Sequence, residues 1–156
     1  MSLSVPSHRP TDGPKFRIGI VAARFNEELV DTLLERLTNG LVAGGVKRRN
    51  LKLLRVPGSH EVPWAAARLA RRPFDCIVAL GVLIGGDTNH HEMVGQSVSH
   101  ALQRVALDSG VPVINGVLVT NTLAQARARC VGSINRGAEF ARAALEMAAL
   151  KRGKKS

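Results

Sequence analysis

The densest group of chemically useful side chains lies between Gly81 and Val94, a segment that reads GVLIGGDTNHHEMV. Two adjacent glycines, Gly85 and Gly86, let the backbone approach a ligand closely. The start of a following helix offers free N–H groups that favour an anion. The histidines after this turn have side chains suited to proton transfer near neutral pH. The segment indicates an anion-binding turn beside a proton-transfer histidine, or a turn that is simply capped by Asp87 or Thr88.

The two histidines do not follow a metal-binding pattern. His90, His91 and Glu92 are consecutive, and successive helical residues lie about 100° apart, so their side chains cannot all face one ion. The zinc-protease pattern needs a second histidine four residues after the first, whereas His100 is too far along. The nucleotide-binding patterns GxGxxG and GxxxxGK[ST] are also absent from the chain. We expect neither a metal site nor one of these nucleotide sites.

Three further positions carry side chains that a site could use. Glu61, in PGSHEVP, could accept hydrogen bonds from a polyol or an amine, or it could be an ordinary first-turn acid of a helix. Arg129 could bind an anion, or it could be a cation near the end of a helix. Phe25 and Asn26 could form an aromatic lid and a helix cap, or they could be packing residues. The residue types alone leave these alternatives open.

The composition indicates one cytoplasmic domain. The chain has 156 residues, 45% of them apolar and only 3% aromatic, so its core must be built from Ala, Val, Leu and Ile. No apolar run is long enough to span a bilayer, and the polar, Pro-rich N-terminus has no signal-peptide pattern. Cys76 and Cys130 have no close cysteine partner, so we expect reduced thiols. We predict a flexible arm, a single domain and a basic tail, over 1–14, 15–150 and 151–156 respectively.

The formal charge of +10, from 22 basic and 12 acidic residues, raises nucleic-acid binding as an alternative. However, four of the basic residues fall in the last six, KRGKKS, and others form short runs at predicted element ends. The aromatic side chains on which single-strand binders stack bases are not interleaved with them. The basic excess also suits phosphate-bearing substrates, and we favour that explanation.

The elements that must position these side chains alternate along the chain. Strands are predicted at 16–23, 51–56, 74–80 and 111–119, and helices at 26–45, 61–72, 92–109, 120–130 and 135–152. Asn26 is the expected N-cap of the first helix, and Thr120 or Asn121 that of the fourth. This order predicts an α/β three-layer fold, with a four-stranded parallel sheet between helices on both faces, as in flavodoxin-like proteins.

In such a sheet, ligands bind at the carboxyl ends of the strands. Four segments leave those ends: ARFNEE, VPGSHEVP, GVLIGGDTNHH and VTNT. They are the least core-like parts of the chain. We therefore expect the site at this edge of the sheet.

Taken together, these segments resemble the lumazine synthase family. The resemblance runs in order from about Lys15 to Leu150, through IGIVAARFNEELVDTLLERL, VPGSHEVPWAA, ALGVLIGGDTNHHEMV, GVPVINGVLVTNTLAQARAR and NRGAEFARAALEMAAL. The motifs RFN, PGxxExP and GxxIxGxTxH carry most of its specificity. It implies condensation of 5-amino-6-(D-ribitylamino)uracil with 3,4-dihydroxy-2-butanone 4-phosphate to 6,7-dimethyl-8-ribityllumazine. Phosphate and water are released in this step of riboflavin biosynthesis, without a metal or organic cofactor.

The resemblance also implies roles for individual residues. His90 matches the family's proton-transfer histidine, and Arg129 matches the arginine that binds the substrate phosphate. Phe25 matches the residue that stacks on the pyrimidine, and Glu61 the one that accepts from the ribityl hydroxyls. The other substrate-binding positions are Asn26, Ser59, His60, Val82, Leu83, Ile84, Gly86, Asp87, Thr88, Asn115 and Arg136.

Several positions depart from the family pattern. His60, His91 and Asn115 stand where aromatic residues are usual, and Gly85 replaces a frequent Arg or Lys. The segment CVGSINRG looks one residue shorter than the common form. A lost stacking face costs roughly 1 kcal/mol of binding, which would weaken affinity more than change the reaction. These departures motivate a second alternative, a catalytically weak paralogue that binds a lumazine or flavin ligand.

The resemblance implies a homo-oligomer as well, either a pentamer or a shell of sixty subunits, with active sites between neighbours. Phe25, Glu61 and His90 would come from one subunit, and Asn115 and Arg129 from the next. Prolines near the N-terminus would hinder an added strand there, which favours the pentamer. Riboflavin synthase is a candidate partner, and neither nucleic acid nor membrane is expected.

Overall fold

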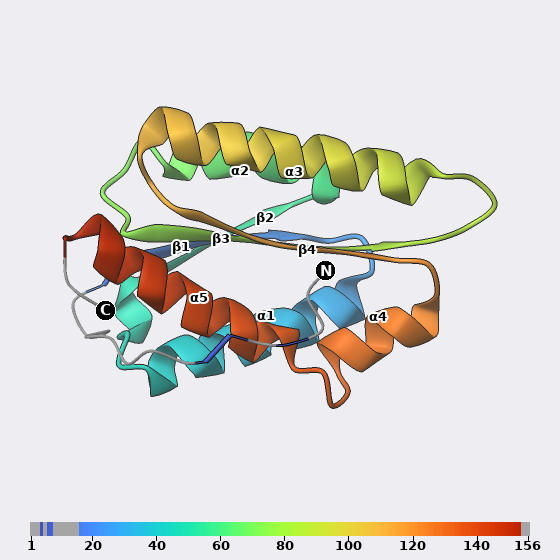
Figure 1. Ribbon diagram of the computed structural model, residues 1–156, viewed down its shortest axis with the longest axis horizontal. Helices are drawn as coiled ribbons and strands as arrows, with labels where there is room; N and C mark the ends of the chain where they lie inside the picture. The colour runs from blue at the N-terminus through green and yellow to red at the C-terminus, as the bar shows by residue number, and fades with distance from the viewer. Residues whose placement is uncertain (1–3, 5, 8–15, 154–156) are drawn as a thin grey trace.

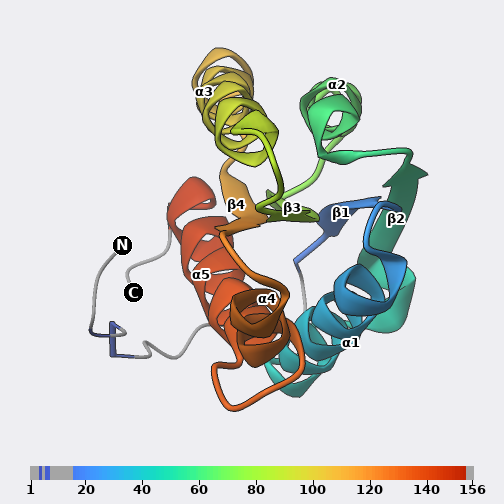
Figure 2. The ribbon, with the colours of Figure 1, turned by 90° about the vertical axis from the view of Figure 1, so that its right-hand side faces the viewer.

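A computed structural model describes residues 4, 6–7 and 16–153 of the protein. Its four strands are parallel and lie in the order β2-β1-β3-β4. Helices α2 and α3 cover one face of the sheet, and α1, α4 and α5 cover the other (Figures 1 and 2). The predicted three-layer α/β fold is confirmed. Most of the predicted arm 1–14, and residues 154–156 of the predicted tail 151–156, lie outside the described residues.

All the predicted elements are present. The strands are β1 (Ile18–Ala23), β2 (Leu51–Val56), β3 (Cys76–Ile84) and β4 (Val113–Thr120). The α-helices are α1 (Glu27–Ala43), α2 (Val62–Leu69), α3 (His90–Ser109), α4 (Leu123–Cys130) and α5 (Arg136–Lys151), with 3-10 turns at Arg48–Asn50 and Ser59–Glu61. Gly110 ends α3 in the left-handed conformation, with φ of 76°, which glycine adopts without strain. No helix in the described part of the chain is long and apolar enough to cross a membrane.

The third strand is longer than its sequence pattern predicts. The predicted strand ended at Leu80, whereas β3 continues through Val82 and Leu83 to Ile84. Pairing with β4 extends it, because Gly81 lies opposite Val117 and the register continues to its last residue. The next helix, α3, begins at His90, two residues earlier than expected. Only the five residues between β3 and α3 are therefore free to form a turn.

Two predicted caps have different roles in the structure. Asn26 occupies the N-cap position of α1, but its side chain makes no capping bond. Its backbone is left-handed, and its Nδ2 donates to the carbonyl of Val82 at 2.7 Å, which ties the start of α1 to β3. Thr122 caps α4 instead of Thr120 or Asn121, because its hydroxyl accepts from the N–H of Gln125 at 3.1 Å.

The core consists of two apolar clusters, one on each face of the sheet. One packs β1 and β3 against α1, α4 and α5, and the other packs them against α2 and α3. Every residue of β1 is buried, as expected for a strand with helices on both sides. The two cysteines are free and buried. Burial raises the pKa of the Cys130 thiol to about 11 and also raises that of Cys76, so both are protonated at neutral pH.

The C-terminal end of α5 is fastened to the amino-terminal edge of the sheet. Asp75, just before β3, accepts hydrogen bonds from Nε and Nη2 of Arg152 at 2.7 and 2.9 Å. The same carboxylate accepts from the backbone N–H of Arg17 at 2.7 Å. The Arg152 guanidinium also lies 5.3 Å from the ring centroid of Phe16. These contacts tie the end of α5 to the amino-terminal ends of β1 and β3. The ligand-binding edge expected from the sequence lies at the other end of the strands.

Candidate active site

A pocket of about 580 Å³ opens at the carboxyl ends of the first three strands. We call it the histidine pocket. Segments that follow β1 and β2, the end of β3 and the first turns of α3 form its wall. The lining residues are Phe25, Asn26, Gly58, Ser59, His60, Glu61, Val82, Leu83, Ile84, His90, His91, Met93 and Val94. The predicted edge of the sheet therefore carries the pocket, and nine predicted site residues meet there.

A second pocket, of about 710 Å³, lies beside the edge strand β4, between α3 and the other helical layer. We call it the arginine pocket. Its lining residues are Glu92, Gly95, Gln96, Ser99, Asn115, Val117, Leu118, Val119, Arg129, Arg136 and Phe140. It contains the three predicted site residues Asn115, Arg129 and Arg136. A single subunit thus places the predicted residues in two different pockets.

The remaining predicted residues, Gly86, Asp87 and Thr88, form the exposed turn before α3 and line neither pocket. The Thr88 hydroxyl accepts from the N–H of His90 at 3.4 Å. The N-cap position belongs to Asn89 rather than to the predicted Asp87 or Thr88. A Cβ added at Gly86 would meet nothing within 4 Å. The backbone of this turn is therefore open to an approaching group.

The end of β4 packs directly on Gly85. Its N–H donates to the carbonyl of Thr120 at 2.8 Å. A Cβ at this position would lie 2.6 Å from the carbonyl oxygen of Asn121. Any side chain here would push the two strand ends apart, so this chain needs glycine at the start of the turn.

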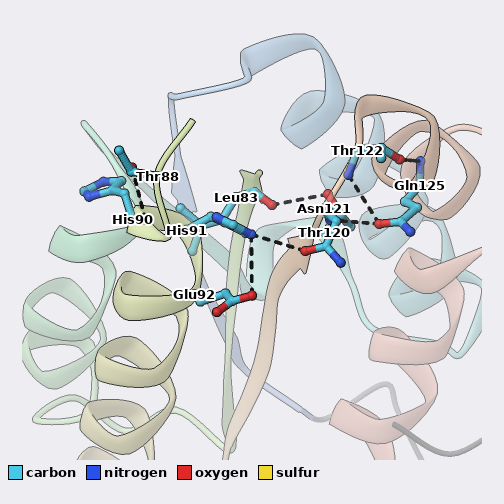
Figure 3. Close-up of polar contacts among 9 residues, drawn as sticks. All are labelled: Leu83, Thr88, His90, His91, Glu92, Thr120, Asn121, Thr122 and Gln125. Carbon is cyan, nitrogen blue, oxygen red and sulfur yellow. Dashed lines mark hydrogen bonds and ion pairs between the residues drawn. The ribbon is translucent and has the colours of Figure 1, made fainter. Parts of the chain in front are cut away.

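The two adjacent histidines point in opposite directions (Figure 3). His90 is exposed and lines the histidine pocket from the first turn of α3. His91 is buried, with 9% of its surface exposed, and its Nε2 lies 3.2 Å from Oδ1 of Asn121. His90 can therefore reach a bound molecule freely, whereas His91 belongs mainly to the wall.

The side chain of Glu61 is held at the pocket wall by its own loop. One carboxylate oxygen accepts from the N–H of Gly58 at 2.9 Å, and the other lies 3.6 Å from Nδ1 of His60. The Phe25 ring beside this loop is 71% exposed. It therefore presents an open aromatic face next to a carboxylate, an arrangement suited to a flat ring that carries hydroxyl groups.

In the arginine pocket, Arg129 points along its own helix and donates to the carbonyl of Gln125 at 3.0 Å. Arg136 forms an ion pair with Glu139 at 2.6 Å. Asn115 accepts from the N–H of Val117 at 3.1 Å. The pocket thus combines two guanidinium groups with an apolar floor, which suits an anion attached to an organic group.

Sequence reasoning missed several residues of these pockets. Met93 and Val94 line the histidine pocket, and Phe140 lines the arginine pocket. Met93 and Val94 follow His90 by three and four positions, so helical spacing could have placed them on its face. No comparable signal identifies Phe140, because its contact with β4 depends on how α5 packs. Among the described residues, no group of three or more His, Cys, Asp or Glu is arranged to hold a metal ion.

Comparison with known proteins identifies the relatives of this chain. Residues 15–152 match the family described as 6,7-dimethyl-8-ribityllumazine synthase. Proteins of that name from Polaromonas sp. and Albidiferax ferrireducens are 45% and 44% identical to it over 140 residues, covering 89% of this chain and 89% and 87% of theirs. The protein of that name from Pyricularia oryzae is 38% identical, with 94% of each chain covered.

Proposed function

Because the chain belongs to the 6,7-dimethyl-8-ribityllumazine synthase family, we propose that it catalyses the condensation that this name describes, a transferase reaction of riboflavin biosynthesis. The amine of 5-amino-6-(D-ribitylamino)uracil attacks the ketone of 3,4-dihydroxy-2-butanone 4-phosphate and forms an imine with loss of water. Phosphate is then eliminated, and the ring closes with loss of a second water. The observation that carries this proposal is that Phe25, Glu61 and His90, from three distant segments, line one pocket. The relatives favour neither a nucleic-acid binder nor an inactive paralogue.

The histidine pocket is proposed to hold the pyrimidine. Its ring would stack on the exposed face of Phe25, beside the end of β3, where Val82, Leu83 and Ile84 line the pocket. The ribityl hydroxyls would donate to the Glu61 carboxylate, which its loop already holds in place. Holding the amine against the ketone would supply most of the rate acceleration.

The phosphate is proposed to bind where an exposed turn of one subunit meets an arginine of the next. The turn Gly86–Thr88 offers open backbone at the start of α3, where the helix dipole favours an anion. Arg129 lies in the separate arginine pocket of its own subunit. A homo-oligomer that sets the arginine pocket of one subunit beside the histidine pocket of its neighbour would complete the site. We propose a pentamer as the basic assembly.

His90 is proposed to transfer protons during imine formation and ring closure. We expect His90→Ala to lower kcat by about tenfold to a hundredfold, because proton transfer contributes less than positioning. The assay follows formation of the fluorescent lumazine from both substrates, corrected for the spontaneous reaction. His100→Ala, an exposed position farther along α3, is the matched control and should retain full turnover.

Two outcomes of this assay separate the possible failures. A wild-type protein that makes no lumazine above the spontaneous rate would refute the proposed function. Complete inactivity of a correctly folded His90→Ala protein would leave that function standing but contradict the modest role assigned to proton transfer.

A further inference from the structure

His91 is a buried polar residue for which the proposed chemistry has no use. It lies in the first turn of α3, next to His90, and only 9% of its surface is exposed. Its Nε2 lies 3.2 Å from Oδ1 of Asn121 and 4.0 Å from a carboxylate oxygen of Glu92 (Figure 3). Because the nearest atom, Oδ1 of Asn121, is an acceptor, we assign the hydrogen to Nε2, which donates it to Asn121.

The other ring nitrogen fits this assignment. Nδ1 of His91 is buried and has no hydrogen-bond partner among the described residues. A proton on Nδ1 would be an unsatisfied buried donor, whereas an unprotonated Nδ1 leaves only an unused acceptor. The His91 ring therefore makes one hydrogen bond, to Asn121. An apolar ring could fill the same buried space but could not make that bond.

Asn121 lies at the end of β4, where β4 is bonded to the end of β3. It directly follows Thr120, whose hydroxyl donates to the carbonyl of Leu83 at 3.3 Å. The Thr120 carbonyl accepts from the N–H of Gly85 at 2.8 Å. The backbone N–H of Asn121 donates to Oε1 of Gln125, in the first turn of α4, at 2.8 Å. Asn121 is thus anchored through its own backbone N–H and through the residue before it.

These contacts hold the exposed turn at both ends. At its start, Gly85 is bonded to Thr120, and just after its end His91 is bonded to Asn121. Among the described residues, the His91–Asn121 bond is the side-chain hydrogen bond that joins the first turn of α3 to the end of β4. The open backbone of Gly86–Thr88 and the side chain of His90 both depend on where that turn of the helix lies.

We infer that His91 is a positioning residue for the proposed condensation. Through its hydrogen bond to Asn121, it holds the first turn of α3 against the end of β4, so that the turn Gly86–Thr88 is preformed for the phosphate of the substrate. This role rests on the proposed function. It acts mainly on the phosphate half of the site. Although His91 also lines the histidine pocket, the groups proposed to hold the pyrimidine, Phe25, Glu61 and the end of β3, lie on other elements.

The test compares substitutions that keep or remove the hydrogen bond. His91→Phe fills the same space without the N–H, and Asn121→Leu removes the acceptor, whereas Asn121→Asp retains one. We expect the first two to raise KM for 3,4-dihydroxy-2-butanone 4-phosphate about fivefold to tenfold, the value of one hydrogen bond. KM for the pyrimidine should change less than twofold, and Asn121→Asp should behave like the wild type. The double variant His91→Phe with Asn121→Leu should be no worse than either single one.

Nitrogen-15 NMR of the histidine rings supplies a measurement that does not need activity. The wild-type protein and Asn121→Asp should show His91 as the Nε2–H tautomer, with a hydrogen-bond shift that is lost in Asn121→Leu. His100→Phe controls for the placement of an aromatic ring on α3. An unchanged phosphate KM in both His91→Phe and Asn121→Leu, or an equal rise in both substrates' KM values, would overturn the inference. If the wild type made no lumazine, the proposed function would fail, and the NMR comparison would still decide whether the bond exists.

Discussion

Arg129→Ala is expected to lower kcat/KM for 3,4-dihydroxy-2-butanone 4-phosphate by about a hundredfold or more. A guanidinium that pairs with a phosphate in a partly desolvated site contributes on the order of 2–5 kcal/mol, and each 1.4 kcal/mol corresponds to about tenfold. Among the described residues, the Arg129 side chain donates only to the Gln125 carbonyl of its own helix, a bond that it can exchange for one to the substrate. Steady-state kinetics with the phosphate substrate varied at saturating pyrimidine measures the effect.

Two substitutions make this prediction specific. Arg129→Lys keeps the charge but loses the two-pronged donor geometry, so we expect an intermediate loss. Arg127→Ala removes an exposed arginine from the same helix that lines neither pocket, and it should leave the kinetics unchanged. Losses of similar size from Arg127→Ala and Arg129→Ala would indicate a general effect of charge and would contradict phosphate binding by Arg129.

Arg129→Ala also tests whether the site is shared between subunits. A second chain that carries both Glu61→Ala and His90→Ala would have a disabled histidine pocket but an intact Arg129. If the two pockets meet across an interface, co-expression of this chain with the Arg129→Ala chain should restore activity at about a quarter of the sites. These are the sites in which an intact histidine pocket of one subunit meets an intact Arg129 of its neighbour. If each subunit used its own Arg129, mixed oligomers would stay inactive.

Asp75→Ala is expected to lower the free energy of unfolding by about 3 kcal/mol. The Asp75 side chain is only 7% exposed and accepts from two guanidinium nitrogens of Arg152 and from the N–H of Arg17. Breaking a buried pair by removing one partner is costly, because the remaining groups lose their bonds without regaining full hydration. Because Arg152 is partly exposed, we expect a loss of stability at the lower end of the range of about 3–5 kcal/mol that is usual for breaking a buried ion pair. Denaturant unfolding at a fixed protein concentration measures it.

The chain offers a matched control for this ion pair. Asp31 forms a bond of 2.8 Å with Arg55, but its side chain is 52% exposed, so Asp31→Ala should cost less than about 1 kcal/mol. Asp75→Ala should also leave the kinetic constants of the folded protein unchanged, because Asp75 precedes β3 and the proposed site lies beyond its other end. Equal destabilisation by Asp75→Ala and Asp31→Ala would show that burial is not what makes the Arg152 pair strong.

The order of elements and the edge that carries the pocket follow from sequence alone. Apolar runs such as 74–80 and helices with apolar residues at regular spacing recur along the chain, and this alternation allows few folds other than a parallel sheet between helices. In that architecture the strand ends gather at one edge, so Phe25, Glu61 and His90 could be placed together before any coordinates were known. The sequence also predicted the chemistry of the turn before α3. Glycines allow a ligand to approach the backbone closely, and a histidine can transfer protons near neutral pH.

Contacts between distant segments decided the rest. The extension of β3 to Ile84 follows from pairing with β4, and the Asn26 side chain bonds to Val82 because α1 begins beside that strand. Two adjacent histidines received different environments because one faces the pocket and the other faces Asn121. The separation of His90 and Arg129 into different pockets arises from packing on opposite faces of the sheet. Local periodicity fixes which residues share a face of an element, but only tertiary packing fixes what that face meets.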